Sequence, residues 1–158
     1  MLTEIAAKLD AWIVARNLEY RADGFPLLRP CRIRLLGQTA LLEAHVPLHL
    51  NVTNDVDVYA DYEHEVRTEF ERLLRAHGKE LDPVGHEAWM PAETTYRELY
   101  GGEFVALSLA EPECILLSKA CKAPERNRAL IVEYLATGPS PRFLELAERY
   151  GVNLETFL

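Results

Sequence analysis

The sequence predicts an α/β or α+β domain, in which a small mixed β-sheet is flanked by helices and followed by a helical tail. Helical and strand-like hydrophobic periods alternate through the first 110 residues, and proline opens each later helix. With 158 residues, 49% of them hydrophobic and 27% charged, the chain has the length and composition of one globular domain. We therefore expect a single domain over 1–158, with an N-terminal helix over 1–23, a sheet core over 31–110 and a helical tail over 111–158.

The first half of the chain supplies alternating helices and strands. Apolar residues recur at helical spacing over 3–19, and CRIRLLG then alternates as a strand does until Gly37. QTALLEAH favours a short helix. DVDVYA alternates again and predicts a second strand, with Asp55 and Asp57 on one face. Residues 63–77 repeat apolar side chains at helical spacing and predict a second long helix.

The second half begins with weaker patterns and ends in helices. Residues 81–90 are weakly extended, 91–99 favour a short helix, and EFVALSLA alternates in a way that suits a strand buried on both faces. Helices are then expected over 112–122, 124–136 and 141–149. Each begins at proline, whose missing N–H is not needed in the first turn of a helix.

The acidic residues are concentrated in the middle third of the chain. The formal net charge is −8, and residues 51–100 alone contain 12 acidic and 5 basic side chains. Because such a field repels phosphate backbones, we expect nucleic acid to contact at most a local basic surface. Arg32 and Arg34 share a strand face and are one candidate for it, although they can equally neutralise nearby acids. The other candidate is the cluster of Lys119, Lys122, Arg126 and Arg128, which can equally be an ordinary solvated face.

The remaining composition predicts a cytoplasmic protein without a membrane segment. No apolar run approaches the roughly 20 residues that span a bilayer. The N-terminal residues are charged and amphipathic rather than a secretory signal, and the three cysteines lack the paired spacing of a zinc site.

Asp55 and Asp57 are the candidate metal ligands. Side chains two apart on a strand point the same way, so these carboxylates project side by side and their repulsion calls for a cation. Mg²⁺ is commonly held by one or two protein carboxylates together with substrate phosphates, and a pair of ions can clamp both oxygens of an in-line displacement. The competing interpretation is an exposed strand face with two solvated acids.

A glycine turn upstream offers a place for phosphate. Gly37 ends the first strand and Gln38 and Thr39 begin the short helix, so backbone N–H groups and two polar side chains there can donate to phosphate oxygens. Residues 38–54 separate this turn from Asp55, enough for one helix and a return to an adjacent strand. The sequence therefore predicts a phosphate-binding turn beside a pair of metal-binding aspartates.

LLGQTALLEAH followed by TNDVDVYA resembles the nucleotidyltransferase-fold (polymerase-beta-like) superfamily, especially its minimal bacterial branch related to AbiEii-type toxin nucleotidyltransferases. The resemblance extends over about 31–136. It implies a magnesium- or manganese-dependent enzyme, in a toxin–antitoxin context, that transfers a nucleoside monophosphate from a nucleoside triphosphate to a hydroxyl of tRNA, another RNA or a protein. It assigns the metal to Asp55 and Asp57, and the nucleotide to Gly37, Gln38, Thr39 and Lys119.

The branch also implies a third carboxylate from a later strand, for which Glu103 is the candidate; Glu103 can equally be a solvated strand end. The chain departs from the branch at Gln38, Asn51 and Asn127, where a glycine, a basic residue and an aspartate are usual. These departures leave a second hypothesis open, a nucleotidyltransferase fold that binds a nucleotide or a partner without turnover. A third carboxylate close to the paired aspartates would favour the enzyme.

Overall fold

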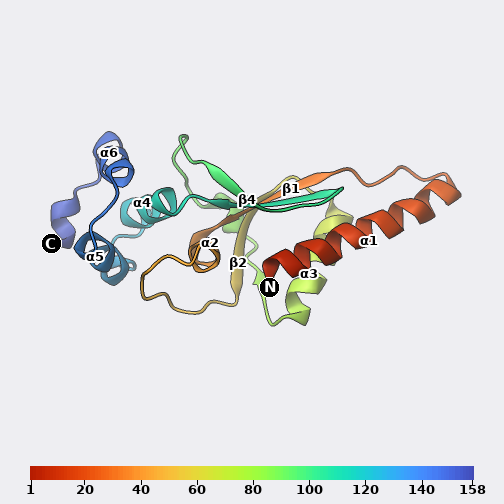
Figure 1. The fold of residues 1–158 in the computed structure, drawn as a ribbon, viewed down its shortest axis with the longest axis horizontal. Coiled ribbons are helices and arrows are strands. Elements are labelled where there is room, and N and C mark those ends of the chain that lie inside the picture. Colours follow the sequence, from red (N-terminus) through yellow and green to blue (C-terminus); the bar gives the residue numbers. More distant parts are fainter.

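The computed structural model describes all 158 residues and contains a five-stranded mixed sheet with helices on one face and at one end (Figure 1). The strands are β1 (Cys31–Leu36), β2 (Asp55–Ala60), β3 (Glu80–Leu81), β4 (Tyr96–Gly101) and β5 (Val105–Ala110). The helices are α1 (Leu2–Asp23), α2 (Gly37–Glu43), α3 (His64–Ala76), α4 (Pro112–Lys122), α5 (Arg128–Ala136) and α6 (Pro141–Arg149), with 3-10 turns at Gly85–Glu87 and Leu154–Phe157. The predicted α/β class with a helix-flanked mixed sheet is confirmed.

The strand order is β3-β2-β1-β5-β4. β1 pairs antiparallel with β2 and parallel with β5, so that Leu36 lies opposite Asp57 and Cys31 opposite Val105. The short β3 runs parallel to β2, and β4 returns antiparallel to β5. The end of β1 therefore meets the beginning of β2, and polar side chains from both gather at one edge of the sheet.

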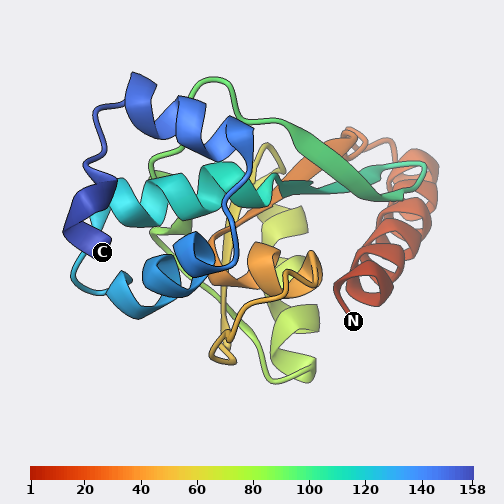
Figure 2. The ribbon, with the colours of Figure 1, turned by 60° about the vertical axis from the view of Figure 1, so that its left-hand side comes forward.

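One face of the sheet is buried and the other is largely open. The buried face consists of alternate apolar residues of three strands: Ile33, Leu35, Val56, Val58, Val105, Leu107 and Leu109. In Figure 1, α1, α2 and α3 lie below the strands. Figure 2 shows α1 beside the tip of the hairpin of β4 and β5, and no helix lies above this hairpin in either view. On the opposite face Arg32 and Tyr59 are exposed and Arg34 is half-buried.

The core is one cluster of 32 buried residues that extends from Leu2 in α1 to Phe157 near the C-terminus. The C-terminal helices join it at the end of the sheet away from α1 (Figure 2). There the rings of Tyr134 and Phe143 pack edge to face, with their centroids 4.9 Å apart. No helix of this structure combines the length and the hydropathy that crossing a membrane requires.

Three local expectations are corrected. The helix expected over 91–99 is wrong, because 96–101 form strand β4, whose bulge between Glu98 and Tyr100 breaks the alternation typical of a strand. Strand β5 is buried on one face only, since no helix covers its other face. Helix α5 begins at Arg128 rather than at 124, because the preceding residues form a separate turn.

Candidate functional site

Three aspartates gather at the edge of the sheet where β2 begins. Asp55 and Asp57 lie two apart on the open face of β2. The parallel pairing of β3 sets Leu81 beside Val56, and the N–H of the next residue, Asp82, donates to the carbonyl of Val56 at 2.9 Å. A side chain 25 residues further along the chain than Asp57 is thereby brought next to it.

The aspartates line a polar cavity of about 480 Å³. Lys119 of α4 and Arg126, in the turn after α4, line the same cavity and form no ion pair with any carboxylate. The cavity therefore holds three acids and two cations that are free to meet a ligand. Its other lining residues are Gln38, Asn51, Val52, Thr53, Ala123 and Asn127.

Burial and neighbouring charges shift the pKa values of two charged groups in this cleft, Asp57 and Lys119. Burial and the neighbouring Asp82 carboxyl raise the pKa of Asp57 to about 6, against the opposing effect of Lys119. Burial and the nearby Arg126 lower the pKa of Lys119, although Asp57 works in the other direction. A cation bound among the carboxylates would relieve the repulsion that raises the pKa of Asp57.

Two glycines make room for the Asp57 side chain. Gly37 has a φ of +61°, and a Cβ at this position would lie 2.3 Å from Oδ2 of Asp57. On the other side, a Cβ on Gly85 would lie 2.9 Å from both Cα and Oδ1 of Asp57. No larger residue fits at either position without displacing the carboxylate.

The loop before β2 forms one wall of the cleft and is anchored to three elements. Gln38 Nε2 donates to the carbonyl of Asn51 at 3.0 Å, and Lys79 Nζ donates to the carbonyl of Thr53 at 2.8 Å. Further out, Glu133 of α5 accepts from the backbone N–H of His49 at 3.0 Å. These contacts fix the loop against α2, against Lys79 just before β3, and against α5.

The donor set fits a hard divalent cation shared with a substrate. Carboxylate oxygens are the ligands that Mg²⁺ and Mn²⁺ prefer. No group of three or more His, Cys, Asp or Glu side chains is placed so that it could hold a metal ion by itself. A pair such as Asp55 and Asp57 suits Mg²⁺, which keeps several waters or takes substrate phosphates in the remaining positions.

Two residues predicted to bind phosphate, Gly37 and Thr39, are not among the residues that line the cavity. Gly37 does not line the cavity; it lies beneath Asp57. The Thr39 hydroxyl donates to the carbonyl of Asp55 at 2.9 Å, so it fastens α2 to β2 and is only 8% exposed. The predicted residues that do line the cavity together are Gln38, Asp55, Asp57 and Lys119.

Glu103 lies at the other end of the sheet and does not supply the third carboxylate. It precedes Val105, which pairs with the first residue of β1, whereas Asp57 pairs with the last. Its N–H donates to Oδ2 of Asp10 at 3.4 Å. The carboxylate that lies next to Asp57, where the third acid was expected, is that of Asp82. Its only sequence signal is an acid beside proline near the start of the weakly extended stretch over 81–90, and nothing in that pattern places it beside β2.

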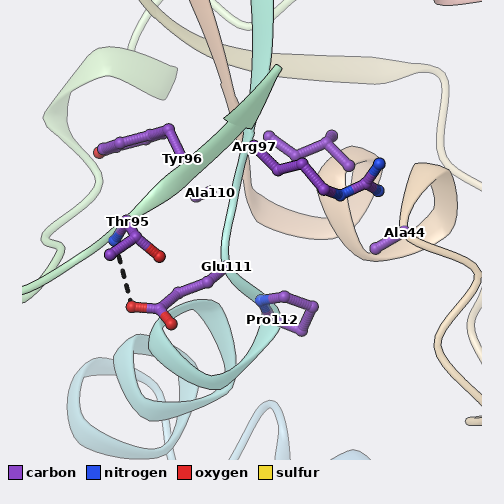
Figure 3. A pocket seen from close by; sticks show the side chains of 8 residues that line it. Ala44, Thr95, Tyr96, Arg97, Ala110, Glu111 and Pro112 are labelled. Atoms are coloured by element: carbon purple, nitrogen blue, oxygen red, sulfur yellow. Dashed lines mark hydrogen bonds between the residues drawn. The ribbon is translucent and has the colours of Figure 1, made fainter. Parts of the chain in front are cut away.

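A second cavity, of about 300 Å³, lies where β4 meets the start of α4 (Figure 3). Glu111 accepts there from the N–H of Thr95 at 3.1 Å and from Nε of Arg142 at 2.8 Å. Burial opposes the ionisation of Glu111, but these hydrogen bonds outweigh it and lower its pKa to about 2. The satisfied carboxylate marks this cavity as a joint between β4, α4 and α6 rather than a reactive site.

No protein-family model, curated protein or solved structure matches this chain.

Proposed function

We propose that this protein is a metal-dependent nucleotidyltransferase that moves a nucleoside monophosphate from a nucleoside triphosphate to a hydroxyl of an RNA or protein acceptor. The observation that carries the proposal is the meeting of Asp55, Asp57 and Asp82 with Lys119 and Arg126 in one cleft. A donor set of carboxylates facing free cations suits a metal–triphosphate complex better than it suits a neutral ligand.

Each side chain has a role that its position supports. Asp55 and Asp57 would hold Mg²⁺ or Mn²⁺, which when bound supplies neutralisation of the phosphate charge. Lys119 and Arg126 would contact the triphosphate oxygens, Lys119 as a point charge and Arg126 through its planar fork of donors. Gln38 supports the wall of the cleft through its bond to Asn51.

The transfer exchanges one phosphorus–oxygen bond for another. The acceptor hydroxyl oxygen forms a bond to the α-phosphorus, and the bond from that phosphorus to the pyrophosphate oxygen breaks. The hydroxyl proton passes to the carboxylate of Asp82, which is oriented by the N–H of Val84 at 3.0 Å from Oδ1. Positioning and charge neutralisation account for most of the acceleration in such chemistry.

A nucleotide-binding module without turnover is the second candidate. The amides of Asn51 and Asn127 line the cleft at two positions where the resembled branch usually has a basic residue and an aspartate. Asp82 favours the enzyme, because it supplies the third carboxylate that a site without turnover does not need.

Transfer of label tests the proposal directly. The protein is incubated with each α-labelled nucleoside triphosphate, Mg²⁺ or Mn²⁺, and total tRNA or cell lysate. We expect at least one nucleotide to label an acceptor, and Asp57→Asn to lower the rate by about 100-fold or more. Asp23→Asn, an exposed acid at the end of α1, is the matched control and should leave the rate unchanged.

Two results would contradict the proposal at different levels. Metal-dependent nucleotide binding by the wild type without any transfer would support the binding module. Binding that survives the combined Asp55→Asn and Asp57→Asn substitution unchanged would show that these aspartates do not hold the metal.

Lys119 and Lys122 offer a second matched comparison. Lys119 lines the cleft, whereas Lys122 is exposed and lies over the Trp89 ring, 5.1 Å from its centroid. We expect Lys119→Gln to raise KM for the nucleoside triphosphate about tenfold or more, since a charge-assisted contact to phosphate is lost. Lys122→Gln should leave KM unchanged in the same steady-state assay, and equal effects of the two substitutions would contradict the assigned role.

A further inference from the structure

The open face of the sheet carries an arginine between two tyrosines, next to the aspartates. Arg34 of β1 lies directly opposite Tyr59 of β2 and Ser108 of β5. Its guanidinium lies over the ring of Tyr96 in β4, 4.6 Å from the ring centroid. We call Arg34, Tyr59, Tyr96 and Ser108 the open-face patch.

This patch is accessible. Tyr59 is 55% exposed on β2, beside the central strand β1, and no helix covers this face (Figure 1). Between the patch's aromatic residues, β5 presents only the small side chains of Ala106 and Ser108, both half-buried. The rings of Tyr59 and Tyr96 and the Arg34 guanidinium are therefore the largest side chains of the patch.

The charge of the patch differs from that of the rest of the chain. Arg34 has no carboxylate within ion-pair distance, whereas Arg32 pairs with Asp61 at 3.5 Å. Glu98 is on the same face, but its carboxylate lies against Gly101, where an added Cβ would be 2.8 Å from Oε1. Although the chain has a net charge of −8, Arg34 has no acidic partner and is available to bind an anionic ligand.

Flat aromatic and guanidinium surfaces on an open sheet suit unpaired nucleobases. Bases stack on tyrosine rings and on arginine planes with little sequence preference, and arginine also contacts the phosphodiester. Tyr59 lies two residues beyond Asp57 on the same strand and face, which is about 7 Å along β2. A chain bound on the patch would therefore pass close to the aspartates.

We propose that the open-face patch binds a single-stranded nucleic acid, with bases stacked on Tyr59 and on the Arg34–Tyr96 pair. That this strand is the acceptor of nucleotidyl transfer rests on the proposed function. The binding itself does not.

Binding of short fluorescent oligonucleotides measures the patch without any need for turnover. Oligouridylate and oligoadenylate, as RNA and as DNA, are titrated with the full chain at about 50 and 200 mM salt, and fluorescence anisotropy is recorded. We expect binding that weakens with salt, about 5- to 100-fold weaker binding for Tyr59→Ala, and wild-type binding for Tyr59→Phe, which keeps the stacking ring. Arg34→Gln should weaken binding and reduce its salt dependence.

Two substitutions elsewhere serve as matched controls. Phe25→Ala removes an aromatic ring that is 58% exposed in the loop after α1, and Arg75→Gln removes an exposed arginine of α3, on the other side of the sheet. Neither should change oligonucleotide binding. Circular dichroism of each variant shows that it is folded.

Several outcomes would overturn the inference. Failure of the wild type to bind any oligonucleotide is one. Binding that survives Tyr59→Ala and is lost in Arg126→Gln would assign the nucleic acid to the cleft instead. If this chain binds another protein through the patch and binds no oligonucleotide, the face is a protein interface instead.

The same variants separate this inference from the proposed function. Asp57→Asn should lower the rate of transfer by about 100-fold or more and keep oligonucleotide binding. If binding depends on Tyr59 in a protein that transfers no nucleotide, the patch stands and the enzymatic proposal fails. If label moves to an acceptor while Tyr59→Ala binds oligonucleotides as the wild type does, the enzyme stands and the patch fails.

Discussion

Single residues determine how closely the Asp57 carboxylate can approach its neighbours. Gly37 combines a left-handed φ of +61° with a missing side chain whose Cβ would fall on the carboxylate. Gly24 at the end of α1 has a similar φ of +74°, but an added Cβ there would meet nothing within 4 Å. A comparison of substitutions at Gly24 and Gly37 therefore separates the effect of backbone strain from the effect of a clash with the Asp57 carboxylate.

We predict that Gly37→Ala disrupts the cleft and that Gly24→Ala does not. Both substitutions should cost about 1–2 kcal/mol of unfolding free energy, because alanine is strained in the left-handed region. Only Gly37→Ala should also weaken metal-dependent nucleotide binding, by about tenfold or more, since the Asp57 carboxylate must move. Urea unfolding and titration with nucleotide and Mg²⁺ measure the two effects. Equal nucleotide affinity in both variants would contradict the role assigned to Gly37.

Between elements, the carboxylates of Asp10 and Glu111 join helices to the sheet and to one another. The Asp10 side chain of α1, 8% exposed, accepts from the N–H groups of Phe104 at 2.7 Å and Val105 at 2.8 Å. Glu111 joins α4 to α6 through Arg142. These acids are structural and lie outside the cleft, so their loss should change stability rather than chemistry.

Asp10→Ala tests the joint between α1 and the hairpin of β4 and β5. We predict a loss of about 2–4 kcal/mol in unfolding free energy, because buried N–H groups are left without an acceptor. Asp23→Ala on the same helix is exposed and should change stability by less than about 0.5 kcal/mol. Urea unfolding compares the two variants. A loss of stability for Asp10→Ala as small as that of the control would show that Asp10 does not stabilise the contact between α1 and the hairpin.

The contribution of the Glu111–Arg142 ion pair to the free energy of unfolding should depend on pH. The folded-state pKa of Glu111 is lowered to about 2, below its ordinary value of 4.5, so its stabilising effect is present above about pH 4.5 and is lost as pH falls toward 2. We expect Glu111→Gln to cost about 1–3 kcal/mol at neutral pH and progressively less below pH 4.5. Urea unfolding of both proteins across this range measures the difference. A difference that stays constant with pH would contradict the assignment.

For the whole molecule, hydrophobic period predicted most elements, because most of them bury one stripe or one face. β2 was recognisable from DVDVYA alone. β4 was not, because it is an edge strand with a bulge. Asp82 was not predicted as a site residue, because the preceding strand β3 has only two residues and no recognisable period. Glu103 was predicted at the wrong end of the sheet, because only the parallel pairing of β1 with β5 shows that the start of β5 lies far from Asp57.

The concentration of acid in the middle third also has a meaning that only the fold supplies. Three of the acids, Glu65, Glu69 and Glu71, lie on α3, and each pairs with an arginine, as in the contacts of Glu71 with Arg67 at 2.9 Å and with Arg75 at 3.1 Å. Asp55, Asp57 and Asp82 form no such ion pairs. Their charge should therefore control whether a triphosphate can approach Lys119 and Arg126.

Removal of metal should reverse the order of affinities between the wild type and a variant without this charge. In EDTA we expect the wild type to bind ATP weakly, because its carboxylates repel the triphosphate. The combined Asp55→Asn and Asp57→Asn variant should bind ATP about tenfold more tightly than the wild type in EDTA. With Mg²⁺ present it should bind less tightly, because it cannot hold the cation.

Calorimetric titration with and without Mg²⁺ measures this reversal, and Asp23→Asn should follow the wild type under both conditions. The advantage of the variant in EDTA should shrink as salt rises, since charges separated by more than about 10 Å are screened at 0.1 M ionic strength. A variant that binds ATP more weakly than the wild type in EDTA as well would mean that the aspartates contact the nucleotide directly. The acidic centre would then be a ligand-binding surface in its own right, and no cation would be needed to reconcile it with a phosphate substrate.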